Sequence, residues 1–160
     1  MKDLREVFES LEQAPAFFRE LAQGYPDADL RWKPSGDRFS FAENACHLRD
    51  IEVEGYGVRI RKLLAEEHPQ LPDIDGSRLA RERDYNSQDF GAALADFERA
   101  RAENVRAVTQ LSSDQLGRAG TLEGVGQITL WKLLHLMCEH DEAHRRELVE
   151  LRERLAAERQ

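Results

Sequence analysis

Four long segments of this chain carry apolar residues at every third or fourth position: residues 4–23, 41–67, 88–111 and 130–157. This spacing gathers the apolar side chains on one face of a helix, whereas a strand would require strict alternation. Each segment would span about 30–40 Å at a rise of 1.5 Å per residue, which is the length of a bundle helix. We therefore predict an all-α protein with the architecture of a four-helix bundle.

The starts of two of these helices are marked by capping residues. Ser40 and Glu43 match the capping box, in which each side chain satisfies an amide at the start of the helix. Thr129 stands directly before the last apolar segment and is suited to cap it. These residues predict helices that begin at residues 41 and 130.

Two stretches between the segments are predicted as connections. Residues 70–87 include a proline and a glycine and few apolar side chains, which indicates a long connection between the second and third helices, with one short helical turn. Residues 117–127 contain four glycines and are predicted to form a loop or a small hairpin. Neither stretch has the composition of a linker between domains.

Length and charge restrict the class of protein. A chain of 160 residues is expected to form a single domain over residues 1–160, with a core that needs no disulfides. The formal net charge of −8 argues against a nucleic-acid partner, because binding phosphates requires clustered lysine and arginine. No apolar run reaches the roughly 18 residues of a membrane span, and the two cysteines lie inside predicted helices. We expect a cytoplasmic protein with reduced thiols and no membrane partner.

Three histidines lie on or beside the apolar faces of two predicted helices. His140 and His144 are four residues apart, hence about 40° apart around a helix, and both fall among inward leucines. His47 lies at the edge of the apolar face of the second segment. Neutral imidazole is a good ligand for zinc, nickel, iron or copper, and three histidines leave a position open for water or substrate. The pattern indicates a metal site of His47, His140 and His144.

Two other interpretations of these histidines compete with a three-histidine metal site. A histidine on an apolar face is more often a hydrogen-bonded core residue, although two adjacent unpaired imidazoles are costly to bury. The stretch HDEAH resembles the zinc-protease motif HExxH, but Asp141 would have to replace the glutamate base. His135 is expected on the outward face of its helix and His68 beside a proline, so both are left out of the site. Cys46 and Cys138 are rotated away from the neighbouring histidines and are interpreted as small buried residues.

The stretch RWKPSGDRFSFAENACHLRDIE resembles the opening of DinB-like proteins. The family pattern of Trp, Pro, Gly, an aromatic-Ser pair, Glu and His-Leu-x-Asp-x-Glu falls here on Trp32, Pro34, Gly36, Phe39, Ser40, Glu43, His47, Leu48, Asp50 and Glu52. A second signature, His-x-x-x-His-Arg-Gly-Gln-Leu, is similar to residues 140–148, where Arg146 and Glu147 replace the glycine and glutamine. The resemblance covers nearly the whole chain in order and spacing. It implies a four-helix bundle of DinB/YfiT type that holds a divalent metal on the three histidines.

The resemblance also implies a role. Members with assigned functions include transferases and isomerases that use a low-molecular-weight thiol such as bacillithiol or mycothiol, and the family commonly forms homodimers. The leading interpretation is a metal-dependent S-transferase that joins such a thiol to a small electrophile, using zinc or nickel, or else iron or manganese. The alternatives are a metal-dependent hydrolase and a non-catalytic, stress-linked metal-binding bundle.

Charged neighbours of the histidines are candidates for supporting roles. Carboxylates often orient metal-bound histidines, and the sequence neighbours suited to this are Asp50, Glu54, Glu139 and Asp141. Arg49 and Arg145 are candidates to bind an anionic thiol or substrate, the alternative being that they are ordinary surface cations.

Overall fold

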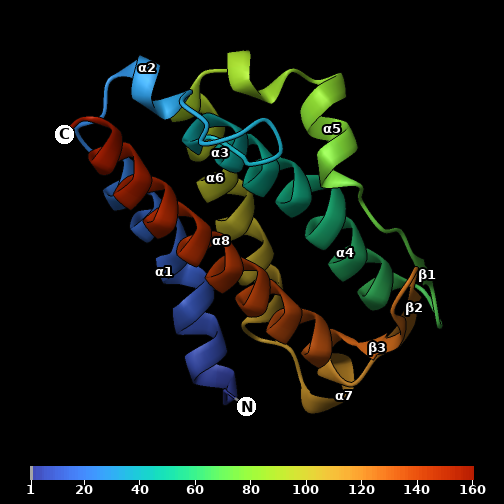
Figure 1. Cartoon of the computed structure of the whole chain (residues 1–160). Helices are drawn as coiled ribbons and strands as arrows, with labels where there is room; N and C mark the ends of the chain where they lie inside the picture. Colours follow the sequence, from blue (N-terminus) through green and yellow to red (C-terminus); the bar gives the residue numbers. More distant parts are fainter. Residues whose placement is uncertain (1) are drawn as a thin grey trace.

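Four long helical segments form the bundle in the computed structural model, which describes residues 2–160. They are α1 (Leu4–Ala22), the continuous run of α3 (Phe41–Asp50), η1 (Ile51–Tyr56) and α4 (Gly57–Ala65), then α6 (Phe90–Val108) and α8 (Leu130–Glu158). The α3 helix packs most extensively against α6, while α1 packs against both α8 and α6 (Figure 1). The predicted four-helix bundle is confirmed.

The helices begin where their capping residues indicate. The Ser40 hydroxyl accepts a hydrogen bond from the amide of Glu43, and the Glu43 carboxylate accepts one from the amide of Ser40. Asp3 and Glu6 form the same capping box at the start of α1. The Thr129 hydroxyl accepts a hydrogen bond from the amide of Lys132 in the first turn of α8. Each cap satisfies donors that have no partner within the helix. The starts predicted at residues 41 and 130 are therefore correct.

The second long segment is interrupted by a π-helix at η1. A π-helix bonds each amide to the carbonyl five residues earlier, so it has more residues per turn than an α-helix. An apolar face projected from α3 at 3.6 residues per turn therefore does not continue unchanged into α4. Val58 is only half-buried, whereas Arg59 and Ile60 are buried. The segment ends at Ala65 rather than at residue 67.

The connection between α4 and α6 contains more structure than one helical turn. It holds β1 (Gln70–Leu71), α5 (Gly76–Glu82) and the 3₁₀ turn η2 (Tyr85–Ser87), and α5 lies beside α3 (Figure 1). Strand β1 pairs in parallel with β2 (Ala119–Leu122), which pairs antiparallel with β3 (Gly126–Thr129). The hairpin before α8 is confirmed, but a two-residue strand has no periodicity from which it can be predicted. The other connections hold the short helices α2 (Asp27–Leu30) and α7 (Ser113–Leu116).

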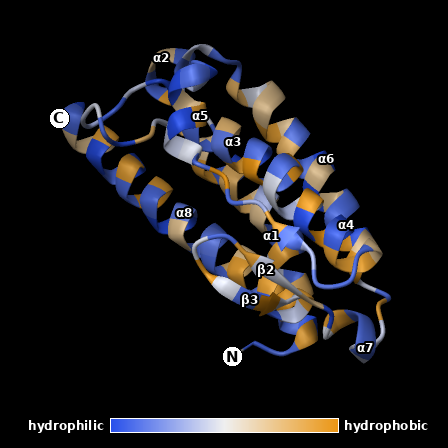
Figure 2. Cartoon of the chain, turned by 90° about the vertical axis from the view of Figure 1, so that its right-hand side faces the viewer, coloured by the Kyte–Doolittle hydropathy of each residue, from blue (hydrophilic) through white to orange (hydrophobic). Residues whose placement is uncertain are grey.

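Two apolar clusters fill the bundle, and a buried polar layer separates them. One cluster includes Val105 of α6 and the other Phe97, with Arg101 between them on the same helix. The guanidinium of Arg101 is 2% exposed and donates two hydrogen bonds to Glu52 and two to Asp141. The inward faces of the helices are otherwise predominantly hydrophobic, as the orange stretches of Figure 2 show. The layer lies at the same height of the bundle as the histidines of α8.

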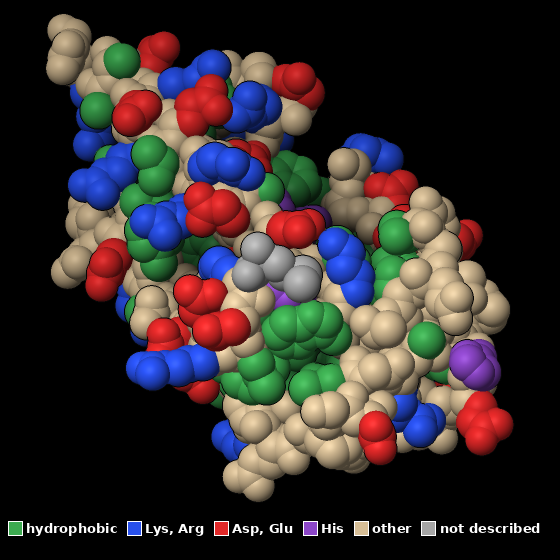
Figure 3. Space-filling view, turned by 90° about the horizontal axis from the view of Figure 1, so that it is seen from below, with side chains coloured by type: hydrophobic (Ala, Val, Ile, Leu, Met, Phe, Trp, Pro, Cys, Tyr) green, Lys and Arg blue, Asp and Glu red, His purple; other side chains and the backbone are tan. Residues whose placement is uncertain are grey.

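Charged side chains of both signs are mixed on the surface. Ion pairs four residues apart, such as Arg5 with Glu9 and Lys62 with Glu66, lie on exposed helix faces. Basic and acidic side chains are interspersed on the face shown in Figure 3. Across residues 2–160 no helix combines the length and the apolar character that crossing a bilayer requires. The absence of a nucleic-acid partner remains a prediction, with which this mixed surface is consistent.

Candidate metal centre

The three histidines singled out in the sequence meet in space. The Nε2 atom of His140 lies 3.2 Å from Nε2 of His47 and 3.2 Å from Nε2 of His144. One nitrogen from each side chain lies within 4.8 Å of the other two. A single ion placed among these nitrogens could therefore contact all three imidazoles. The structure thus brings together His47 of α3 with two residues one turn apart on α8.

Burial keeps two of these imidazoles neutral. Burial, together with the nearby His144, lowers the pKa of His47 to about 4. Burial also lowers the pKa of His140 to about 2, with the neighbouring histidines acting in the same direction. At neutral pH both side chains carry a lone pair, which is the form that binds a metal.

A hydrogen bond to Asn44 sets the tautomer of His144. The amide nitrogen of Asn44 donates to the carbonyl of Ser40, so its Oδ1 atom is turned toward Nδ1 of His144 at 2.8 Å. An amide oxygen only accepts, and Nδ1 must therefore carry the proton. Nε2 of His144 is left unprotonated and faces the other two histidines. Such a partner fixes the orientation of a metal-bound histidine.

The carboxylate of Glu147 supports the same ring. Its Oε2 atom lies 3.3 Å from Nδ1 of His144. Burial favours the protonated form of Glu147, but hydrogen bonding to His144 and the charge of Arg38 outweigh it and lower the pKa of this carboxyl. Glu147 stands where the family signature has glutamine, so this chain adds a negative charge at the edge of the histidine cluster.

Replacing Asn44 with alanine is expected to weaken metal binding by about 10–100-fold, because the partner that holds the Nδ1 proton of His144 is lost. Titration of the metal against a chromophoric chelator measures the change. Asn44→Asp keeps an acceptor oxygen at the same place and is expected to retain most of the affinity. Equal losses in the two variants would contradict this role for Asn44.

A pocket of about 540 Å³ opens beside the histidines. His47 and His144 line it together with the carboxylates of Asp37, Asp73, Asp75 and Glu147. No lysine or arginine is among the residues that line it. The pocket is open to solvent, so a small molecule could reach the histidine nitrogens through it. Its walls favour cationic or neutral groups over anions.

The four acidic neighbours suggested by the sequence lie elsewhere. Asp50 bonds to Arg49, Arg83 and Tyr85. Glu54 pairs with Arg83, and the exposed Glu139 lies 3.9 Å from Lys132. Asp141 is bound to Arg101, which also removes it from the role of base that the HExxH interpretation required. Among residues 2–160, the side chains that contact a histidine nitrogen of the site from outside the cluster are Asn44 and Glu147.

The two arginines suggested as anion-binding groups also face away from the pocket. Arg49 donates to Asp50 and to Gln88. The guanidinium of Arg145 lies 4.0 Å from the centre of the Phe17 ring. Neither side chain lines the pocket beside the histidines. No positive charge from these two residues is therefore available to an anionic cosubstrate there.

A simple spacing rule would have found Glu147, one of the two partners missed in the sequence. Glu147 lies three residues after His144 on α8, whereas Asn44 reaches His144 from another helix. Residues three or four apart share a helix face, so polar side chains at these offsets from a candidate ligand are its nearest helical neighbours. Asp141 and Glu139 lie one residue from His140 and therefore point to other faces of α8.

The prediction that His135 lies on the outward face of its helix is wrong. The side chain is only 8% exposed. Its ring packs edge-on against Trp131, with centroids 4.4 Å apart. The face of α8 opposite His140 and His144 is covered by the start of the chain, as the contact of Cys138 with the carbonyl of Val7 shows. His135 still lies outside the cluster, and both cysteines are buried and free, as expected.

Comparisons with known proteins give a family and a similar fold for this chain. A family model described as the DinB superfamily matches residues 10–148. The structure of YfiT from Bacillus subtilis is similar with a TM-score of 0.87 and 21% sequence identity, covering 98% of this chain and 91% of that one. YfiT is described as a probable metal-dependent hydrolase with an unusual four-helix bundle topology. No curated protein matches the sequence. At this identity the likeness to YfiT shows a shared fold.

Proposed function

Since the chain belongs to the DinB superfamily and gathers three imidazole nitrogens at the wall of an open pocket, we propose that it is a metal-dependent hydrolase of small molecules. The observation that carries the proposal is the convergence of three Nε2 atoms, two of the pairs being 3.2 Å apart. The description of YfiT as a probable metal-dependent hydrolase supports the same class of reaction.

The donor set fits a divalent metal. With its proton on Nδ1, His144 presents a lone pair at Nε2, and the adjacent His140 is neutral. Facing lone pairs repel unless a proton or a cation lies between them. Nδ1 of His47 and Nδ1 of His140 are also buried without a hydrogen-bond partner within residues 2–160. A cation shared by the three Nε2 atoms would remove this repulsion between lone pairs, and imidazole suits zinc, nickel and iron, with manganese a weaker match.

Each residue of the site has a separate task in such a reaction. A divalent metal bound to three histidines supplies a Lewis acid, which lowers the pKa of a coordinated water and polarises a carbonyl. His47, His140 and His144 would hold it, and Asn44 keeps the lone pair of His144 directed inward. The Glu147 carboxylate lines the pocket and can accept a hydrogen bond from a group bound there. Phe39 and Ile74 supply apolar surface for a substrate.

The pocket favours water over an anionic thiol as the attacking group. Four carboxylates line it, whereas the arginines suggested for thiol binding are engaged elsewhere. A carboxylate-bearing thiol would enter against this charge without a lysine or arginine in the lining to bind its carboxylate. We therefore place hydrolysis of a neutral or cationic ester, lactone or amide ahead of the S-transfer that the sequence suggested.

Removal of the metal is expected to reduce hydrolysis of a neutral chromogenic ester to the uncatalysed background, and reconstitution with zinc, nickel, iron or manganese should restore it. Far-UV circular dichroism should stay unchanged on chelation, because the bundle has its own apolar core. A quaternary-ammonium ester should be hydrolysed faster than its carboxylate analogue.

Three outcomes would contradict the proposal. Unfolding on chelation would favour a structural metal that holds the helices together. Metal-dependent formation of a thioether from a small thiol and an electrophile, detected by mass spectrometry without ester hydrolysis, would favour the transferase. Absence of turnover by the metal-loaded protein toward neutral, cationic and anionic esters, lactones and amides would contradict a hydrolase.

A further inference from the structure

His47 differs from His144 in what orients its ring. Nδ1 of His144 is held by Asn44, whereas Nδ1 of His47 is buried and has no hydrogen-bond partner within the described residues. A metal-bound histidine normally has its second nitrogen fixed by an acceptor, which sets the direction of the first. The ring of His47 must therefore be directed by packing, and its aromatic neighbour outside the cluster, Phe39, has its ring centroid 5.6 Å away.

Gly76 supplies the packing surface on the other side. A Cβ atom built on Gly76 would lie 2.5 Å from Cε1 and 2.6 Å from Nδ1 of His47, closer than such atoms approach in proteins. The backbone of α5 thus rests directly on the imidazole. Gly76 does not have a left-handed backbone, so the glycine is required by the nearness of His47 rather than by its own conformation.

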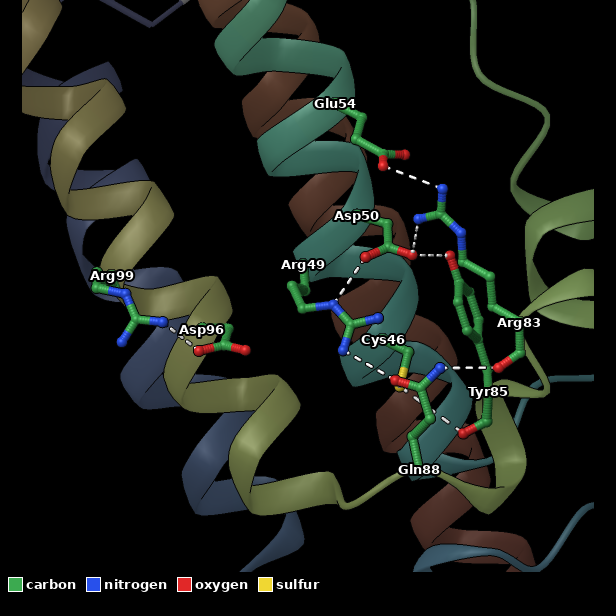
Figure 4. A network of polar contacts seen from close by, with 9 residues as sticks. All are labelled: Cys46, Arg49, Asp50, Glu54, Arg83, Tyr85, Gln88, Asp96 and Arg99. Atoms are coloured by element: carbon green, nitrogen blue, oxygen red, sulfur yellow. Dashed lines mark hydrogen bonds and ion pairs between the residues drawn. The ribbon is translucent and has the colours of Figure 1, made fainter.

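The segment that carries Gly76 is fastened to α3 by a polar clamp, which we define as Asp50, Arg83 and Tyr85. The Tyr85 hydroxyl donates to Oδ2 of Asp50 at 2.5 Å, and Arg83 donates to the same oxygen at 2.8 Å. Figure 4 shows both side chains reaching Asp50 from the segment that follows α5. Tyr85 is fully buried, and Asp50 is 6% exposed.

The clamp and the histidine lie on the same helix. Asp50 follows His47 by three residues on α3, so an attachment at Asp50 fixes α5 relative to the base of the His47 side chain. Leu79 and Ala80 of α5 add apolar contacts to Ala45 and Cys46 of α3. Both α5 and the residues that follow it are therefore attached to α3, the helix that carries His47.

We propose that Gly76, Tyr85 and Asp50 are positioning residues for the metal: the clamp presses the backbone at Gly76 against His47 and so directs Nε2 of His47 toward the two histidines of α8. The same attachment holds Asp73 and Asp75 at the pocket wall. This inference rests on the metal site of the proposed function. Asp50 then acts on the site through packing, and it does not contact a metal-binding histidine.

Gly76→Ala is expected to weaken cobalt(II) binding by about 10–100-fold, the range found when a partner that orients a metal ligand is lost. It should also change the visible absorption of bound cobalt, which reports ligand geometry. Gly36→Ala is the matched control, because Gly36 has no atom within 4 Å of a built Cβ and no left-handed backbone. That control should bind cobalt as the wild type does.

Tyr85→Phe tests the clamp with a smaller change. It removes one hydroxyl from Asp50, and we expect a loss of affinity of less than about 10-fold together with a shifted cobalt spectrum. A lower melting temperature with an unchanged spectrum and affinity would show that Tyr85 is only structural and would overturn its role. Unchanged binding in Gly76→Ala would overturn the inference as a whole.

The same measurements separate this inference from the proposed function. Wild-type protein that binds cobalt but hydrolyses no ester would contradict the hydrolase and leave the positioning of His47 to be decided by the variants. Wild-type protein that binds no cobalt would overturn the metal site and the inference together.

Discussion

Replacing His140 with alanine is expected to weaken divalent metal binding by at least about 100-fold, because loss of an outer partner of a ligand alone costs about 10–100-fold. His140 is the central member of the cluster, since its Nε2 atom is 3.2 Å from the Nε2 atoms of both other histidines. Without it, two imidazoles remain, which is fewer than the three protein ligands of a typical catalytic zinc site. Metal-dependent hydrolysis should fall to background.

His135→Ala is the matched control for this variant. His135 is also a buried histidine of α8, but it packs against Trp131 on the opposite face of the helix. Calorimetric titration of zinc or nickel into both variants gives the affinities, and thermal unfolding shows whether each variant folds. Metal affinity reduced equally in His135→Ala and His140→Ala would contradict the assigned site.

Replacing Arg101 with methionine is expected to lower the free energy of unfolding by about 3–5 kcal/mol, because it leaves two buried carboxylates without their cation. Arg101 is 2% exposed and bonds to Glu52 and Asp141, which are 1% and 6% exposed. Its guanidinium also donates to the carbonyl of Leu11. The methionine fills much of the same space, so the loss measures mainly the unpaired charges. Urea denaturation at neutral pH provides the value.

Two further variants distinguish this explanation from a general loss of packing. Arg99→Met lies on the same helix, but Arg99 forms an exposed ion pair with Asp96, worth at most about 1 kcal/mol (Figure 4). Adding Glu52→Gln and Asp141→Asn to Arg101→Met removes the unpaired carboxylate charges and should recover part of the lost free energy of unfolding. A loss in Arg101→Met no larger than that in Arg99→Met would contradict the role of the buried layer.

Much of the scaffold could be read from the chain because helix formation depends on local pattern. The apolar repeat and the capping residues at Ser40 and Thr129 located the long helices to within a few residues. The π-helix at η1 was not foreseen, since an extra residue in one turn leaves no repeat in the sequence. Strand β1 was missed for a similar reason: its two residues become a strand by pairing with β2.

The candidate site was predictable in part. His140 and His144 share a helix face through their spacing, and His47 lies at the edge of a second apolar face. The likeness of two separated motifs to one family supported all three residues. The supporting side chains were misplaced, because proximity in sequence was taken as proximity in space. Asp141 adjoins His140 yet turns to Arg101, whereas Asn44 reaches His144 from another helix.

By itself, the sequence determined the long helices, where they begin and that His140 and His144 share a helix face, because these properties depend on residues within a few positions of one another. Tertiary structure alone decided how α3 and α8 align, and therefore that three Nε2 atoms meet. It also decided that Gly76, on a segment far along the chain from His140, closes against His47. Such contacts depend on the relative placement of packed elements, which local periodicity does not encode.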